Sequence, residues 1–248
     1  MNTAAESPEP AQSEPIALIT GASRGLGAAL AEALSARGYH VVAVARTTGA
    51  LEELDDRIQA AGGRATLAPI DITDDNALRH LCRSIHDRWG RVAFWAHTAV
   101  HAPPLAPAGH VAIKDLDRTL AVTARATGVL IPMLEPLLRA AANGTAAHGT
   151  ALFFDDPTMR DEAGATRKFW GSWALAKEGQ MALVRAWAAE CAALGPARAP
   201  RVVVATPRPM PTATRARFFP GERREDLARP ADEAARILDA LPAELLRA

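Results

Sequence analysis

The chain has 248 residues, with 28 basic against 28 acidic side chains, 49% hydrophobic residues, two cysteines and one tyrosine. This length suits one α/β domain that buries its core without disulfides. Zero formal net charge argues against a nucleic-acid-binding protein. No apolar run approaches the ~20 residues needed to span a bilayer. With no signal-peptide pattern and no metal-type cysteine spacing, we expect a cytoplasmic protein without a metal site.

Short apolar runs alternate with helical patterns along almost the whole chain. Residues 1–15, rich in Glu, Ser and Pro, come first and predict a disordered tail. Strands are then predicted at Ile16–Ile19, Val41–Val44, Ala65–Ile70, Val92–Ala96, Ala151–Phe154 and Val202–Ala205. Helices are predicted at about 26–34, 51–58, 78–85, 113–141, 172–193 and 231–241. Pro132 and Pro136 should kink the fourth helix or end it early.

This alternation predicts right-handed β-α-β crossovers, and hence a parallel sheet with helices on both faces. The sequence contains no internal repeat and no second core, so residues 16–248 are predicted to form one doubly wound Rossmann-type α/β domain. In such a sheet, ligands bind beyond the carboxyl ends of the strands. The residues directly after each strand are therefore the first candidates for a functional site.

A glycine-rich loop follows the first predicted strand and opens the first helix. It reads Thr20-Gly21-Ala22-Ser23-Arg24-Gly25-Leu26-Gly27. Glycines permit a tight turn and a close backbone approach, and a helix amino end offers free N–H groups to a pyrophosphate. A packing turn without ligand is the alternative, but the position between a buried strand and a helix favours a dinucleotide site.

The spacing of this loop resembles the fingerprint of the short-chain dehydrogenases/reductases. Asp71-Ile72-Thr73-Asp74 resembles that family's segment whose first Asp contacts the adenine ring, and 207–212 resembles its segment beside the nicotinamide, with Arg208 in a glycine place. The resemblance implies hydride transfer between a nicotinamide cofactor and a small carbonyl or alcohol. It also implies a homodimer or homotetramer built on the fourth and fifth helices.

Charge at the end of the second strand indicates which dinucleotide is bound. An NAD-preferring site places Asp or Glu there, whereas this chain has Arg46 there and Arg24 in the glycine loop. Two guanidiniums suit a 2′-phosphate, which predicts NADP(H) over NAD(H); two solvated arginines are the alternative. The predicted cofactor-binding residues are Gly21, Ser23, Arg24, Gly25, Leu26, Gly27, Arg46, Thr47, Asp71, Ile72, Ala96, Lys177, Pro207 and Thr212.

Most of the catalytic positions that the resemblance implies carry other residue types. The family's tyrosine, serine and asparagine positions fall on Trp173, Asp156 and Thr123, and only Lys177 matches. An indole N–H donates a hydrogen bond but does not exchange a proton at useful pH. The one tyrosine, Tyr39, lies at the start of the second strand and cannot replace it.

Several roles remain open around these positions. His97 and His101 both follow the fourth predicted strand and are candidates for a substitute proton donor; the alternative for His101 is a spectator. Asp156 is expected to form an ion pair with Lys177; the alternative is a proton donor or acceptor whose pKa is raised by burial. Trp173 is expected to fill the substrate space; the alternative is stacking beside the nicotinamide. Residues 207–229 resemble the family's substrate lid, which the prolines should make extended and stiff.

Two functions are compatible with this pattern. The first is an NADP-dependent oxidoreductase that acts on a small-molecule substrate and uses a substitute proton donor. The second is a dinucleotide-binding protein that has lost redox catalysis and serves as a sensor or a partner subunit.

Overall fold

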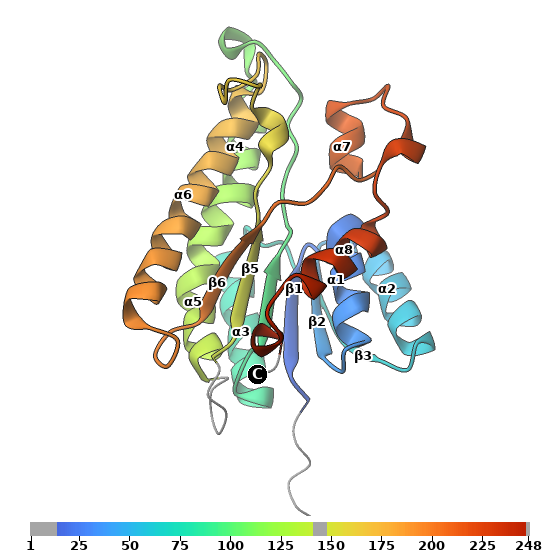
Figure 1. The fold of residues 1–248 in the computed structure, drawn as a ribbon, viewed down its shortest axis with the longest axis vertical. Coiled ribbons are helices and arrows are strands. Elements are labelled where there is room, and N and C mark those ends of the chain that lie inside the picture. Colours follow the sequence, from blue (N-terminus) through green and yellow to red (C-terminus); the bar gives the residue numbers. More distant parts are fainter. Residues whose placement is uncertain (1–13, 141–147, 247–248) are drawn as a thin grey trace, which may run out of the picture.

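The computed structural model describes residues 14–140 and 148–246, so the predicted disorder of residues 1–13 lies outside the described residues. Within that part of the chain, strands form one parallel sheet in the order β3-β2-β1-β4-β5-β6 (Figure 1). The strands are β1 (Ile16–Thr20), β2 (His40–Ala45), β3 (Arg64–Pro69), β4 (Phe94–His97), β5 (Thr150–Phe154) and β6 (Arg201–Ala205). Strand order reverses between β1 and β4, where doubly wound sheets bind ligands. The predicted fold class is therefore confirmed.

Helices cover both faces of this sheet (Figure 1). One face packs on α1 (Gly25–Ser35), α2 (Thr48–Ala60) and α8 (Pro230–Asp239). The other packs on α3 (Asp75–Trp89), α5 (Ala126–Ala140) and α6 (Gly171–Leu194). Because successive strand side chains alternate between faces, Leu18 joins the second core and Ile19 the first.

The fourth predicted helix is continuous but irregular. It comprises α4 (Ile113–Thr119), a π-helical segment, η2 (Leu120–Arg125), and α5. The prediction that a proline ends it early is wrong, because both Pro132 and Pro136 lie inside α5. A Cβ on Gly128, four residues before Pro132, would lie 3.3 Å from the Leu183 side chain of α6, so this glycine lets α5 and α6 approach closely.

This helix, Ile113–Ala140, is also long and apolar enough to cross a membrane by length and composition. By length and composition, this helix is therefore an exception to the expectation that no segment is apolar enough to span a bilayer. However, 44% of its most apolar window is buried, and Leu130, Leu134 and Leu138 pack into the core beside the sheet. It is built as a core helix.

The predicted lid, residues 207–229, is only partly extended. It contains α7 (Ala213–Phe218) and a short 3-10 turn, η4 (Arg224–Asp226), which corrects the expectation of a fully extended segment. The Thr212 side chain accepts a hydrogen bond from the Arg215 N–H at 3.2 Å and so caps α7. Figure 1 shows α7 standing beyond the carboxyl edge of the sheet.

Candidate functional site

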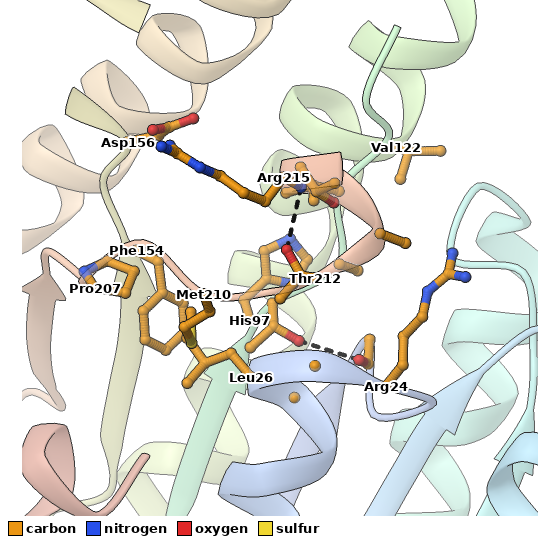
Figure 2. A pocket seen from close by; sticks show the side chains of 18 of the residues that line it. Arg24, Leu26, His97, Val122, Phe154, Asp156, Pro207, Met210, Thr212 and Arg215 are labelled. Atoms are coloured by element: carbon orange, nitrogen blue, oxygen red, sulfur yellow. Dashed lines mark hydrogen bonds between the residues drawn. The ribbon is translucent and has the colours of Figure 1, made fainter. Parts of the chain in front are cut away.

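A cavity of about 280 Å³ lies at the carboxyl edge of the sheet, between the glycine loop, the ends of β2–β5, and the lid. Figure 2 shows Arg24 at one side of this cavity, Phe154 and Pro207 at the other, and His97 between them. The predicted site residues that line it are Gly21, Ser23, Arg24, Gly25, Leu26, Gly27, Arg46, Asp71, Ile72, Asp156, Trp173, Lys177, Pro207 and Thr212.

Four predicted site residues do not line the cavity. Thr47 is the exposed residue that precedes α2, and Ala96 is fully buried inside β4. Thr123 is buried in the π-helical segment, where its hydroxyl accepts a hydrogen bond from the His101 N–H at 3.2 Å. Burial and the nearby Arg118 lower the pKa of His101, which keeps its imidazole neutral near pH 7.

The glycine loop is shaped by close contacts. Gly21 has a φ of 90°, and a Cβ there would lie 2.7 Å from both the Thr98 hydroxyl and the Ala99 nitrogen. A Cβ on Gly27 would collide with the Gly21 carbonyl oxygen. These positions need glycine because α1 starts directly against the ends of β1 and β4.

Among the residues that the structure describes, no side chain caps the amino end of α1. Arg24 holds the capping position without a side-chain hydrogen bond to the helix, whereas Asp74 caps α3 by accepting from the Asn76 and Ala77 N–H groups. The N–H groups in the first turn of α1 therefore face the cavity side of the loop without a side-chain acceptor. Such a helix end attracts an anion.

Charges beside this helix end differ in how they are paired. Neither the Arg24 nor the Arg46 guanidinium forms an ion pair with any residue in 14–140 or 148–246, and both line the cavity. Asp71 instead accepts a hydrogen bond from Arg118 at 2.8 Å. Burial raises the pKa of Asp71, but hydrogen bonds from Arg118 and Thr73 outweigh burial and lower the pKa to about 2. The sequence interpretation missed Arg118, because nothing local connects it to Asp71.

Trp173 stands at the tyrosine position, and its indole N–H does not exchange a proton at useful pH. Its side chain is 2% exposed, and its indole N–H donates to the Asp156 carboxylate at 2.8 Å. Asp156 also accepts from the Thr158 N–H at 3.0 Å, which caps a short turn at Pro157–Met159. The side-chain polar atoms of Trp173 and Asp156 are thus bonded to protein groups at the positions where the family's tyrosine and serine would stand.

Lys177 makes its hydrogen bonds to the protein. Its ammonium donates to the Phe154 carbonyl at 2.6 Å and to the Gln180 amide oxygen at 2.7 Å. The predicted ion pair with Asp156 is wrong, since no ion pair joins these two described residues and Trp173 occupies the carboxylate instead. Burial lowers the pKa of Lys177 to about 8, and the nearby Asp156 and Asp155 oppose that shift.

An aromatic cluster borders the cavity beside Trp173. The Phe218 ring from α7 lies 4.6 Å from the Trp170 ring and 5.2 Å from the Trp173 ring. Phe219 stacks under the Arg215 guanidinium at 3.8 Å. Apolar contacts of Phe218 therefore hold the lid against the start of α6.

The base of the lid is tied to α8 by a buried carboxylate. Glu233 is 0% exposed and accepts from the Arg208 N–H at 2.9 Å and from its guanidinium at 2.6 Å. Arg236 also donates to Glu233, at 3.0 Å. Burial raises the pKa of Glu233, but these hydrogen bonds outweigh it and lower the pKa to about 2. This gives a structural role to Arg208, which stands in a glycine place.

Of the two candidate histidines after the fourth predicted strand, His97 lines the cavity and His101 does not. His97 ends β4, is 3% exposed, and lies with its Nδ1 2.7 Å from the Thr20 hydroxyl. The sequence signal for His97 was its position after the predicted strand Val92–Ala96, whereas the structure includes it in β4. Among the residues that the structure describes, no group of three or more His, Cys, Asp or Glu side chains is placed to hold a metal ion.

Comparison with known proteins agrees with this architecture. A family model described as short chain dehydrogenase matches residues 15–148, which is more than half of the chain. Among curated proteins, a fatty acyl-CoA reductase from Acinetobacter baylyi is 43% identical over 84 residues. That match covers 34% of this chain and 28% of the relative, so the chain aligns with less than a third of the relative's length.

Solved structures match over most of the chain. A 3-ketoacyl-ACP reductase from Sinorhizobium meliloti 1021 has a TM-score of 0.76 at 25% identity and covers 94% of both chains. A metagenomic short-chain oxidoreductase in complex with NADP has a TM-score of 0.73 at 23% identity, covering 90% of this chain and 89% of that one; this second likeness concerns the fold alone. The family match and the six-stranded parallel fold together establish that the chain belongs to the short chain dehydrogenase family.

Proposed function

We propose that this protein binds NADP(H) and does not carry out hydride transfer by the tyrosine-dependent route of its family. Within the described part of the chain, no side chain caps the amino end of α1 and no carboxylate pairs with Arg24 or Arg46, and these features support the binding half of this proposal. These groups suit a pyrophosphate and a 2′-phosphate, respectively. When bound, the cofactor would supply a hydride donor or acceptor; the residues of this chain decide whether a proton can accompany it.

The observation that carries the proposal is the hydrogen bond from the Trp173 indole to the Asp156 carboxylate. General acid–base catalysis contributes about 10²–10⁴-fold to enzymatic rates. The side-chain N–H of Trp173 cannot supply it, because it does not exchange a proton at useful pH and already donates to Asp156. Phe218 packs against the same indole, with 5.2 Å between the ring centroids, and lines the cavity beside it. The protein would then act as a dinucleotide-dependent sensor or as a partner of an active subunit.

A titration with NADPH and NADH, followed by nicotinamide fluorescence, tests the binding half. We expect NADPH to bind at least about 10-fold more tightly than NADH, since charge-assisted bonds to a phosphate are worth more than about 1.4 kcal/mol. Arg46→Ala should remove most of that preference, while Arg83→Ala, on the exposed side of α3, should leave it intact. Equal affinity for both dinucleotides would refute the assigned roles of Arg24 and Arg46.

An assay of NADPH oxidation against a broad carbonyl panel tests the catalytic half. The unmodified protein is expected to show no turnover, and the double variant Trp173→Tyr with Asp156→Ser is expected to gain some. The Trp173→Phe variant is the matched control, because it changes the ring without supplying a hydroxyl. Robust turnover by the unmodified protein would contradict the proposal.

A second candidate is an NADPH-dependent reductase with a different proton donor. The names of the relatives favour it, since both the fatty acyl-CoA reductase and the 3-ketoacyl-ACP reductase are described as reductases. The carbonyl panel separates the two candidates. Turnover that disappears in His101→Ala would support the reductase and identify the substitute donor.

A further inference from the structure

One buried polar atom points to a ligand contact that the glycine loop does not explain. His97 Nε2 is buried and has no hydrogen-bond partner among residues 14–140 and 148–246. Among the described residues, Asp55 and His148 also carry such an atom, but only His97 lines the cavity. Buried polar atoms in folded proteins are nearly always satisfied, so an unsatisfied one at a cavity wall indicates a missing partner.

The His97 ring is held so that Nε2 cannot find a partner elsewhere in the protein. Its Nδ1 is 2.7 Å from the Thr20 hydroxyl. The ring also packs against Trp95, at 5.6 Å between centroids, and against Phe153, at 5.9 Å. Either tautomer leaves one hydrogen-bonding position at Nε2: an N–H if Nδ1 accepts from Thr20, or a lone pair if Nδ1 donates.

The charge state of His97 restricts which group it suits. Burial lowers the pKa of His97 to about 3, and the ammonium of Lys177 adds to that shift. The imidazole therefore stays neutral at physiological pH and offers a single uncharged hydrogen bond. A neutral partner such as a hydroxyl or a carboxamide suits it, whereas the phosphates suit Arg24 and Arg46.

Position along the cavity identifies the part of the ligand. His97 neighbours Thr20, the residue before Gly21, and lies on the Lys177 side of the glycine loop. Arg46 and Asp71 lie on the opposite side, at the ends of β2 and β3. A dinucleotide whose pyrophosphate rests on α1 and whose 2′-phosphate meets Arg46 must extend its other half toward His97.

We infer that His97 Nε2 binds a ribose hydroxyl or the carboxamide in the nicotinamide riboside half of NADP(H). The inference rests on the proposed function. It adds a hydrogen bond to the half of the cofactor that lies on the Lys177 side of the cavity. Within the described chain, the ammonium of Lys177 already has two protein acceptors. His97 thereby becomes a binding residue on the side of the cavity that Lys177 and Trp173 also line.

Calorimetric titration with two ligands tests this inference. NADPH contains the nicotinamide riboside, and adenosine 2′,5′-bisphosphate lacks it. His97→Phe, which keeps an aromatic ring among aromatic neighbours, should weaken NADPH binding about 10-fold, because one buried hydrogen bond is lost. The same variant should bind adenosine 2′,5′-bisphosphate as the unmodified protein does, which also reports an intact fold.

Nitrogen NMR of the ¹⁵N-histidine-labelled, unmodified protein gives a second readout that does not depend on folding of a variant. The His97 Nε2 resonance should shift when NADPH is added and stay in place when adenosine 2′,5′-bisphosphate is added. His86→Phe, an exposed histidine change on α3, is the matched control and should alter neither affinity.

The outcomes separate this inference from the proposed function. Unchanged NADPH affinity in His97→Phe together with an unmoved Nε2 resonance would overturn the inference alone. If His97→Phe weakens the binding of both ligands equally, the Nε2 resonance of the unmodified protein tests the inference instead. A shift with NADPH alone supports it, and no shift overturns it. If the unmodified protein binds neither ligand, the proposed function fails, and the role of His97 falls with it.

Discussion

Trp173 and Lys177 sit four residues apart on α6, so both side chains reach the same region of the cavity. Their polar atoms are nevertheless bonded to protein groups: the indole to Asp156, and the ammonium to the Phe154 carbonyl and Gln180. Gln180 in turn donates to the Thr127 hydroxyl at 2.9 Å. The lysine thus joins β5 and α6 to α5, which is a scaffolding role.

The buried ammonium predicts a specific pH dependence of stability. Burial lowers the pKa of Lys177 from 10.5 to about 8, so between these values the unfolded chain binds more protons than the folded one. The contribution of Lys177 to stability therefore increases as the pH rises through that window. Relative to Lys177→Met, the unmodified protein should gain about 1 kcal/mol of unfolding free energy between about pH 7 and about pH 9.

Urea denaturation at the two pH values measures this difference. The exposed Lys168 supplies the control, because the stability difference between the unmodified protein and Lys168→Met should not change with pH. A flat or falling difference for Lys177→Met would show that the ammonium is not desolvated as the structure indicates.

At the scale of elements, the lid is the segment in which local pattern and tertiary structure disagree most. Its prolines predict an extended chain, but Thr212 caps α7 and the Phe218 ring fits between Trp170 and Trp173. Glu233 on α8 holds the base of this segment through Arg208. The lid is therefore fixed at both its base and its apolar tip.

Glu233→Gln should loosen the base of the lid. Losing the charge of a carboxylate that accepts from two guanidiniums should cost about 2 kcal/mol of unfolding free energy. Hydrogen exchange by mass spectrometry should show faster exchange across residues 207–219, with β1 unchanged. Glu225→Gln, an exposed carboxylate that pairs with Arg223 inside the lid, is the control and should change exchange little.

The same carboxylate sets an acid limit for the lid. Because the pKa of Glu233 is lowered from 4.5 to about 2, its stabilising contribution is complete above about pH 4.5 and is lost as the pH falls toward 2. The stability difference between the unmodified protein and Glu233→Gln should shrink over that range. A difference that persists at about pH 2 would refute the assignment.

At the scale of the whole molecule, α6 presents an apolar stripe to the outside. Leu175 is 55% exposed and Leu183 is 41% exposed, and between them lies Gly179, where a Cβ would meet nothing within 4 Å. Positions four and eight residues apart share one helix face. We propose that this stripe, together with α5, forms the interface of the homodimer or homotetramer that the family resemblance implies.

Light scattering during size-exclusion chromatography tests the assembly. The protein should elute as a dimer or tetramer, and Leu175→Arg combined with Leu183→Arg should shift it toward the monomer, because two guanidiniums cannot be buried without partners. Leu194→Arg, at the far end of the same helix, should leave the mass unchanged. A monomeric unmodified protein would contradict this interface.

Much of the fold was predictable because its signals are local. Each strand begins within about two residues of its predicted start, since a short apolar run between polar segments is read directly from the chain. The glycine loop was predictable for the same reason. The continuous passage of α5 through Pro132 and Pro136 was not, because packing of Leu130 and Leu134 against the sheet outweighs the local cost of the prolines.

The sequence by itself determined the order of the elements, the position of the glycine loop and the absence of the family's tyrosine, all of which depend on residue type and short spacing. Only the tertiary structure decided how the altered residues are used: Trp173 with Asp156, Lys177 with the Phe154 carbonyl, and Arg208 with Glu233. These partners are 17 to 25 residues apart in the chain. No short periodicity links residues at such separations, and which polar groups meet depends on how the strands, α6 and α8 pack together.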